Sequence, residues 1–254
     1  MIVRTLIAAN PGPYTLDGTR TYLLNEMSVI DPGPDLDDHL GTILASCEKI
    51  ESIFVTHRHD DHAGAVDRLR RKTGARVYAP VGALTETIVD HLVESGESFD
   101  VGGESLEAIA TPGHTAEHVC YFSEDGSLFT GDVILGEGTT TIFPPDGDMG
   151  DYLASLRKLK ERRPRRIYPG HGPVREDAVA LIEEYIAHRE MRERQILDAL
   201  ESGPATPRDL RERIYPDLHS SLEAAAELQM RAHLDLLIRK GRVSTRDERF
   251  SLVG

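Results

Sequence analysis

Short apolar runs alternate along the first two thirds of the chain with polar turns and with stretches of helical spacing. Val, Ile, Phe and Tyr dominate the short runs, and Pro, Gly, Asp and Asn separate them, which is the pattern of β-strands. The predicted strands are residues 1–9, 20–24, 28–30, 53–55, 76–78, 106–110, 119–122, 128–130 and 166–168. Asp125-Gly126 between two of these runs predicts a hairpin.

Helices are predicted where apolar residues recur every three or four positions. The predicted helices between the strands are residues 36–47, 66–74, 81–93 and 152–159. Strands that alternate with helices in this way predict an α/β fold.

The last part of the chain has a different pattern, with long helical stretches followed by two short extended runs. A helix is expected from about Asp177 to Leu200, and Thr206-Pro207 is a typical start for a second one over residues 208–214. A third is expected over 222–238, and 242–244 and 250–253 read as strands. Three helices and a hairpin predict a winged helix, so we divide the chain into residues 1–184 and 185–254.

The chain of 254 residues has a net charge of −14, and this charge is unevenly distributed. Residues 185–254 hold twelve basic and twelve acidic side chains, so residues 1–184 carry the whole excess. A polyanionic substrate such as nucleic acid is therefore not favoured by long-range attraction. Cys47 and Cys120 are too few for a disulfide scaffold, and no apolar run is long enough to cross a bilayer. With no secretory signal at its start, the chain is expected in the cytoplasm, without a membrane partner.

Histidine and aspartate cluster where predicted strands end. Thr56-His57-Arg58-His59-Asp60-Asp61-His62 follows the strand at 53–55, and His114, Asp132 and His171 each follow a later strand. Pro-Gly precedes His114 and His171, which gives each a fixed turn. Imidazole and carboxylate groups are ligands for zinc and similar metals, and loops at strand ends converge on one edge of a sheet. We therefore expect a metal site.

These motifs resemble the metallo-β-lactamase superfamily, with its His-x-His-x-Asp-His signature and later Gly-His, Gly-Asp and Gly-His motifs, over residues 5–175. The resemblance implies a four-layer αβ/βα sandwich with two metals at one edge. It implies that His57, His59 and His114 bind the first metal. Asp61, His62 and His171 would bind the second, and Asp132 would bridge both. Asp31, from an Asp-Pro-Gly motif, would orient a ligand imidazole from outside the ligand set.

A closer resemblance, to the lactamase-β-like proteins, covers most of the chain. It rests on Asn10 to Leu23, Gly131 to Thr140, Tyr168 to Pro173 and Tyr185 to Arg189. That group includes an endoribonuclease that acts on single-stranded RNA, and its members carry a winged helix at this position. Arg58 departs from many relatives, as does the acidic charge balance.

The resemblance implies a hydrolase with two zinc ions per chain, or iron or manganese in their place, that attacks its substrate with a metal-bound hydroxide. Asp61 would orient or deprotonate that hydroxide, and His118 is either a proton donor or an ordinary strand histidine. The leading hypothesis is a phosphodiesterase acting on single-stranded RNA, with Arg20 and Arg58 holding phosphates. A thioester hydrolase of the glyoxalase II type is the second hypothesis. A nucleic-acid-binding regulator built on a lactamase scaffold is the third.

The role of the C-terminal part is left open by its sequence. Five arginines, at positions 231, 239, 242, 246 and 249, are candidates for nucleic-acid contact. The alternative is a module that packs against the main domain, shapes the rim of the site or forms a homodimer interface. Zero net charge over residues 185–254 favours packing.

Overall fold

Two mixed β-sheets form the centre of the main domain in the computed structural model, which describes residues 1–253. The first sheet has the order β1 (Val3–Ile7), β2 (Arg20–Leu24), β3 (Ser28–Ile30), β4 (Ser52–Phe54), β5 (Arg76–Pro80) and β6 (His91–Val93). The second has the order β11 (Arg166–Pro169), β10 (Ser127–Gly131), β9 (Val119–Ser123), β8 (Ser105–Ala110) and β7 (Ser98–Asp100). β1 to β3 are antiparallel and β3 to β6 parallel, while only β10 and β11 are parallel in the second sheet.

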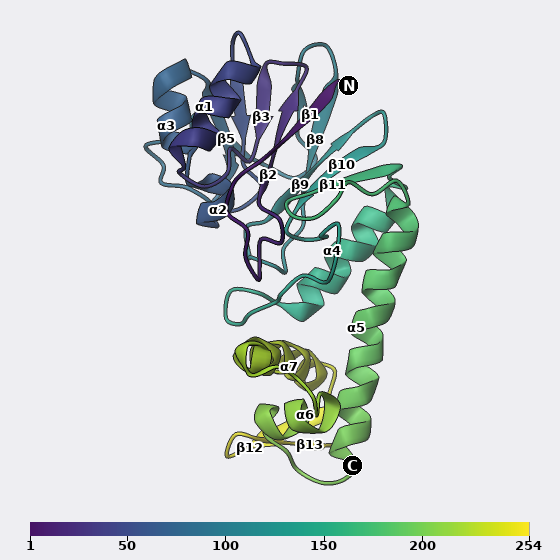
Figure 1. The fold of residues 1–254 in the computed structure, drawn as a ribbon. Helices are drawn as coiled ribbons and strands as arrows, with labels where there is room; N and C mark the ends of the chain where they lie inside the picture. The colour runs from purple at the N-terminus through teal and green to yellow at the C-terminus, as the bar shows by residue number, and fades with distance from the viewer. Residues whose placement is uncertain (254) are drawn as a thin grey trace.

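Helices cover the outer face of each sheet, so the domain has four layers (Figure 1). Helices α1 (Asp37–Ser46) and α3 (Val66–Thr73) lie on the first sheet, and α4 (Met149–Glu161) and α5 (Ala178–Leu200) on the second. Alternation along each strand explains the layers, because successive side chains point to opposite faces. On β2, for example, Leu23 packs under the outer helices while Tyr22 and Leu24 face the other sheet. The predicted αβ/βα sandwich is confirmed.

The C-terminal part folds around its own apolar core and contains α6 (Pro207–Ile214), the 3₁₀ turn η1 (Ser220–Leu222), α7 (Glu223–Arg239), β12 (Val243–Arg246) and β13 (Arg249–Leu252). Thr206 begins α6 with the expected cap, and it exchanges hydrogen bonds with Asp209. The predicted winged helix is therefore confirmed. Hereafter residues 201–253 are called the C-terminal module.

Helix α5 connects the two parts without a break, so residues 184 and 185 both lie inside it (Figure 1). Its first turns pack on the second sheet, while Ile196 and Leu200 belong to the core of the C-terminal module. Helix α7 also contacts both parts, because Ala232 and Leu236 pack in the cluster that contains α4. The module is therefore docked on the main domain through two helices.

The helix predicted over residues 81–93 is wrong. Turns occupy most of that segment, and its end is strand β6, which pairs with β5 in parallel. Gly82 has a φ of +89°, which a right-handed helix does not allow. The Asp90 carboxylate accepts a hydrogen bond from Val77 N and so ties the segment to the sheet. The apolar residues Leu84 and Ile88 pack under the first sheet from turns, and this packing accounts for their helix-like spacing.

Besides β6, the prediction lacks three short elements, namely β7, the four-residue helix α2 (Asp60–Ala63) and the 3₁₀ turn η1. Among residues 1–253, no helix is long and apolar enough to span a bilayer.

Candidate metal centre

The histidine and aspartate side chains singled out in the sequence lie together where strands of both sheets end. The motif from Thr56 to His62 follows β4 and continues into α2, while His114 follows β8. Asp132 comes directly after β10, and His171 follows β11 after a Pro-Gly turn. Strand ends from two facing sheets thus hold the side chains on a rigid frame.

The first group of potential ligands is His57, His59, His114 and Asp132. His59 Nδ1 lies 3.0 Å from His57 Nε2 and 3.1 Å from His114 Nε2. Asp132 Oδ2 approaches the same space, at 3.6 Å from His114 Nε2 and 4.0 Å from His57 Nε2. Three imidazoles and one carboxylate oxygen therefore converge on a single point.

The second group is Asp61, His62 and His171. The Nε2 atoms of His62 and His171 are 3.2 Å apart, and Asp61 Oδ2 lies 3.2 Å from His171 Nε2. Asp132 contributes its other oxygen here, since Oδ1 is 3.2 Å from His62 Nε2 and 3.3 Å from His171 Nε2. The Asp132 carboxylate thus lies between the two groups with one oxygen toward each.

Asp31 fixes the imidazoles of both groups from behind. Its Oδ2 lies 2.8 Å from His62 Nδ1 and accepts from Thr56 Oγ1 at 2.7 Å, and that hydroxyl lies 2.9 Å from His57 Nδ1. Asp31 has a φ of +49°, a conformation uncommon for a residue other than glycine but one that aspartate tolerates better than most. The arrangement is the one expected of a carboxylate that orients ligand imidazoles.

Glycines bring the backbone close to these rings. A Cβ atom on Gly170 would lie 2.5 Å from His62 Cε1 and 2.7 Å from Asp132 Oδ1. A Cβ on Gly113 would lie 2.3 Å from the backbone of Tyr152, at a φ of +136°. The Pro-Gly-His sequences before His171 and His114 therefore require glycine for steric reasons.

The donor set fits divalent metal ions. His57, His62 and His114 each direct Nδ1 at an oxygen of the protein, namely Thr56 Oγ1, Asp31 Oδ2 and Thr141 O. In the neutral form of these rings the Nε2 atoms carry lone pairs that face one another. In addition, Asp132 Oδ1 is buried and has no hydrogen-bond partner. Cations held between these nitrogens and oxygens satisfy both features, and nitrogen with carboxylate oxygen suits zinc.

Burial and neighbouring charges together set the pKa values of the acid–base groups in this cluster. Burial lowers the pKa of His57 well below its usual range, with the charges of His62 and His118 acting in the same direction. Burial of Asp132 favours its protonated form, but His62 and His171 outweigh it and hold the pKa of Asp132 well below the usual range. Asp132 is therefore ionised and His57 neutral, which are the forms that bind metals. For His62 and His171, burial favours the neutral ring, but Asp132 outweighs it and raises the pKa of His62 well above its usual range and that of His171 to about 9. Metal binding would release protons from these two rings.

His118 lies behind the cluster and is not in the wall of the cavity. It is fully buried, and its ring stacks on that of His57 with the centroids 4.9 Å apart. Its Nε2 accepts from Asp132 N at 3.3 Å, and its Nδ1 lies 3.0 Å from Thr111 Oγ1. This geometry favours a role in positioning Asp132 over proton donation to a substrate.

Arg20 and Arg58 are both engaged by carboxylates. Arg20 is 6% exposed, and both of its terminal nitrogens donate to Asp17, at 2.9 and 3.0 Å. Arg58 lies nearer the site, at the rim, but it forms ion pairs with Glu117 and Asp146. Neither guanidinium is therefore without a carboxylate partner, and neither lines the cavity beside the cluster.

A cavity of about 510 Å³ opens beside the potential metal ligands. Its floor includes His59, Asp61, His114 and Asp132. Its walls include the apolar side chains Pro13, Tyr14, Leu16, Leu135 and Phe143, together with the acidic Glu137 and Asp146. The cavity has no Lys or Arg in the wall formed by residues 1–253. Tyr14 and Phe143 meet edge to face, with ring centroids 6.4 Å apart.

An αβ/βα sandwich that carries this cluster of histidines and carboxylates at its sheet edge defines a class of metal-dependent hydrolases. Residues 25–171 match the model of the metallo-beta-lactamase superfamily, and residues 206–250 match that of the beta-lactamase associated winged helix domain. The chain belongs to the metallo-beta-lactamase superfamily and is an enzyme of its hydrolase class.

Relatives and solved structures are similar over nearly the whole chain. The beta-lactamase-like protein 2 homolog of Caenorhabditis elegans is 37% identical, over 94% of this chain and 85% of the relative. An atrochrysone carboxyl ACP thioesterase of Aspergillus fumigatus is 36% identical, over 84% of this chain and 73% of its own length. A metallo-beta-lactamase family protein of Thermus thermophilus has the same fold, with a TM-score of 0.81, 23% identity and coverage of 99% and 98%.

The sequence pattern does not reveal the residues that shape the cavity. Tyr14 and Leu16 come from the loop after β1, and Leu135 and Phe143 come from the segment after Asp132. These residues belong to loops without apolar periodicity, and only the fold places them beside the ligands. Arg189 is not distinguished by the sequence either, because its burial follows only from the fold.

Proposed function

We propose that this protein is a binuclear metal-dependent hydrolase of acyl thioesters. The observation that carries the proposal is the cavity itself, with apolar side chains on its walls, acidic groups at its rim and no cationic side chain in its lining. Such a cavity favours an apolar acyl group placed next to the metal centre over a chain of phosphates. Of the two rim carboxylates, Asp146 is paired with Arg58, and Glu137 would repel a polyanion at short range.

For the metals, we propose one zinc ion held by His57, His59 and His114 and another by Asp61, His62 and His171, with Asp132 shared by both. When bound, divalent cations of this kind polarise a carbonyl oxygen and make water a stronger acid. Iron and manganese accept the same nitrogen and oxygen donors. Asp31 and Thr56 keep the ligand nitrogens aimed inward.

Asp61 is the group that this chain offers for proton transfer. Its carboxylate faces the cavity, is partly exposed and lies near Thr19 Oγ1, which donates to Oδ2 at 3.4 Å. In the proposed reaction the oxygen of a water molecule bonds to the thioester carbon, and Asp61 Oδ accepts a proton from that water. The C–S bond then breaks, and the same proton passes to the leaving sulfur, which gives a carboxylic acid and a thiol.

The walls of the cavity would bind and orient the acyl group. Tyr14 and Phe143 close one side of the cavity through their edge-to-face contact, and Leu16 and Leu135 add aliphatic surface. Burial of an acyl chain there excludes water from its path, which strengthens the electrostatic contacts at the carbonyl group. A relative with a thioesterase name, at 36% identity, supports the same reaction class.

The alternative is hydrolysis of single-stranded RNA, as the sequence resemblance implies. Two metals also suit in-line phosphoryl chemistry. The chain's cations give this alternative little support, however, because Arg20 and Arg58 are paired with carboxylates. In the C-terminal module, Arg231, Arg239 and Arg249 are paired likewise, with Asp235, Asp148 and Asp209. The module therefore supports a packing role more than nucleic-acid contact.

The proposal is tested with zinc-loaded protein and a series of acyl-pantetheine thioesters, followed by release of the free thiol. We expect close to two metal ions per chain by elemental analysis and a kcat/KM that rises as the acyl chain grows from two to about eight carbons, because each buried CH₂ contributes about 0.8 kcal/mol. Full activity with a single metal contradicts the binuclear centre. Absence of thioester turnover in the two-metal protein contradicts the substrate class.

A further inference from the structure

We propose that Gln229 of α7 and Arg189 of α5 position the metal-facing side chain of His114, so that the helices that carry the C-terminal module form part of the metal centre. The inference rests on the metal centre proposed above but not on the substrate class. It concerns the segment Thr139 to Phe143, which lines the cavity on one side and contacts both helices on the other.

One peptide group connects His114 to the C-terminal module. His114 Nδ1 lies 2.9 Å from Thr141 O, and the N–H of the next residue, Ile142, donates to Gln229 Oε1 at 3.0 Å. Thr141 C=O and Ile142 N–H belong to the same planar peptide unit and point in opposite directions. A side chain that fixes the N–H therefore also fixes the carbonyl that orients the His114 ring.

The neighbouring peptide group is held by Arg189. Its Nη2 donates to Thr140 O at 2.5 Å and to Thr139 Oγ1 at 2.8 Å. The guanidinium is buried and lies over the Tyr152 ring, 5.3 Å from its centroid. A buried charge with these contacts has few other positions available, so the carbonyl it holds is fixed with it. Thr140 also donates from Oγ1 to Asp132 O at 2.9 Å.

The segment Thr139 to Phe143 is therefore held by hydrogen bonds on two sides. Toward the metals it meets His114 and the backbone of Asp132, and toward the helices it meets Arg189 and Gln229. Outer partners of this type hold the tautomer and the direction of a ligand imidazole. Arg189 and Gln229 act through Thr140 and Thr141 and are positioning residues.

Gln229 is tested by two substitutions. Gln229→Leu removes the acceptor of Ile142 N, and Gln229→Glu keeps an oxygen at that place. The readout is cobalt(II) bound to the full chain, with affinity measured by competition with a chromophoric chelator and ligand geometry by visible absorption. We expect Gln229→Leu to weaken the site that contains His114 by about 10-fold, the low end for an outer partner, and to change its spectrum. Gln229→Glu is expected to restore both properties.

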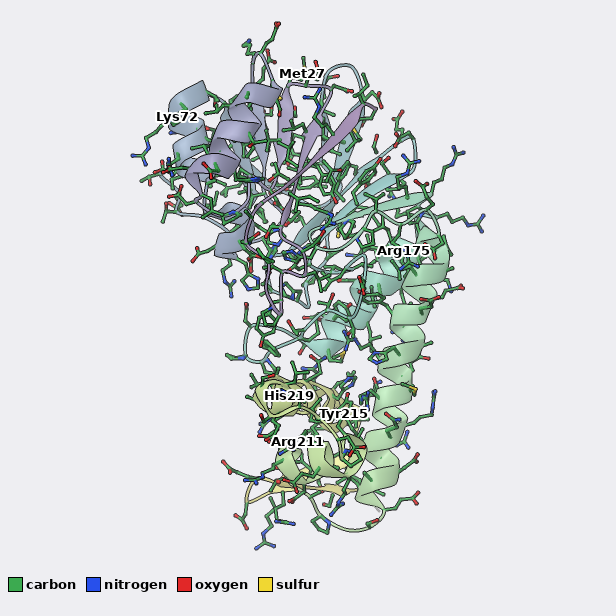
Figure 2. The ribbon with its side chains drawn as sticks, viewed as in Figure 1. Met27, Lys72, Arg175, Arg211, Tyr215 and His219 are labelled. Carbon is green, nitrogen blue, oxygen red and sulfur yellow. The ribbon has the colours of Figure 1, made fainter. Side chains whose placement is uncertain are left out.

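Arg189 is compared with Arg192, a matched control on the same helix. Arg192 is also buried, but its guanidinium lies 4.2 Å from the centroid of the Tyr215 ring, and Tyr215 lies in the C-terminal module (Figure 2). Arg189→Gln and Arg192→Gln should both lower the melting temperature, because each removes a buried guanidinium. Only Arg189→Gln should also weaken cobalt binding and alter its spectrum.

The outcomes separate this inference from the proposed metal centre. Wild-type protein that binds no cobalt overturns the metal centre itself. Wild-type protein that binds cobalt, with Gln229→Leu and Arg189→Gln unchanged in affinity and spectrum, overturns the positioning role alone. Equal effects of Arg189→Gln and Arg192→Gln on cobalt binding also overturn it, because they would reflect general loss of stability.

Discussion

At Asp132, a single carboxylate faces two groups of imidazoles. One oxygen approaches His57 and His114, while the other, buried and without a hydrogen-bond partner, approaches His62 and His171. Cations held between the two groups would satisfy this buried oxygen directly, and a buried charge without such partners is costly. The proposed metal centre therefore depends on Asp132 more than on any other single side chain.

Asp132→Ala removes both of these oxygens. We expect the metal content to fall below one ion per chain and hydrolysis to fall at least about 100-fold, since both metals lose a ligand. The far-ultraviolet circular dichroism should change little, because the surrounding strands do not depend on this side chain. Exposed Asp247→Ala serves as the control and should keep both metals. Two metals retained by Asp132→Ala would rule out a bridging role.

The apolar wall of the cavity predicts how substrates are distinguished. Phe143→Ala removes one of the two rings that meet over the cavity and should raise KM for an eight-carbon acyl thioester about 10-fold. The two-carbon acyl group can bury little surface on this wall, so its KM should change little. Steady-state kinetics on both substrates make the comparison, and an equal rise in the two KM values would place the acyl group elsewhere.

At the level of elements, the positions of strands and the site were predictable to different degrees. Short apolar runs between turn residues locate the strands well, and Asp125-Gly126 marks a real hairpin, with Gly126 at a φ of +88°. The clustering of the candidate ligands was predictable because they follow strands that end at one edge. The segment 81–93 was mispredicted as a helix because its apolar side chains pack from turns at the sheet edge.

Other features of the site could not be read from the chain. The carboxylate partners of Arg58 lie far from it in sequence, at Glu117 and Asp146, so its neutralisation follows only from the fold. Gln229 is 87 residues from Ile142 and reaches it only because α7 docks on the main domain. Contacts between distant segments carry no local periodicity and therefore leave no pattern in the sequence.

The turn before His114 offers a prediction about elements. In Gly113→Ala the new Cβ would overlap the backbone of Tyr152 near the start of α4, at a φ that alanine avoids. We expect the free energy of unfolding to fall by about 2–4 kcal/mol. Gly41→Ala is the control: Gly41 lies in α1 with open space around its Cα, and this change should stabilise by about 0.5–1 kcal/mol. Urea denaturation measures both, and a neutral Gly113→Ala would contradict the close approach.

At the scale of the whole molecule, charge and architecture point to the same substrate class. The main domain carries the net charge of −14, and its cavity is apolar with an acidic rim. The C-terminal module is neutral, is docked through α5 and α7, and directs several arginines at its own or neighbouring carboxylates. These features agree with the proposed apolar acyl substrate and with the proposed role of the module in positioning the metal centre.

The most direct test of this account is a parallel assay of one zinc-loaded preparation against an eight-carbon acyl-pantetheine thioester and a short single-stranded RNA, at about 50 and 200 mM salt, with Asp132→Ala as the inactive control. We predict thioester hydrolysis that depends on Asp132 and changes little with salt, since few ionic contacts form on binding. RNA cleavage that depends on Asp132 and weakens steeply with salt, without thioester turnover, would contradict the account and establish the phosphodiester alternative.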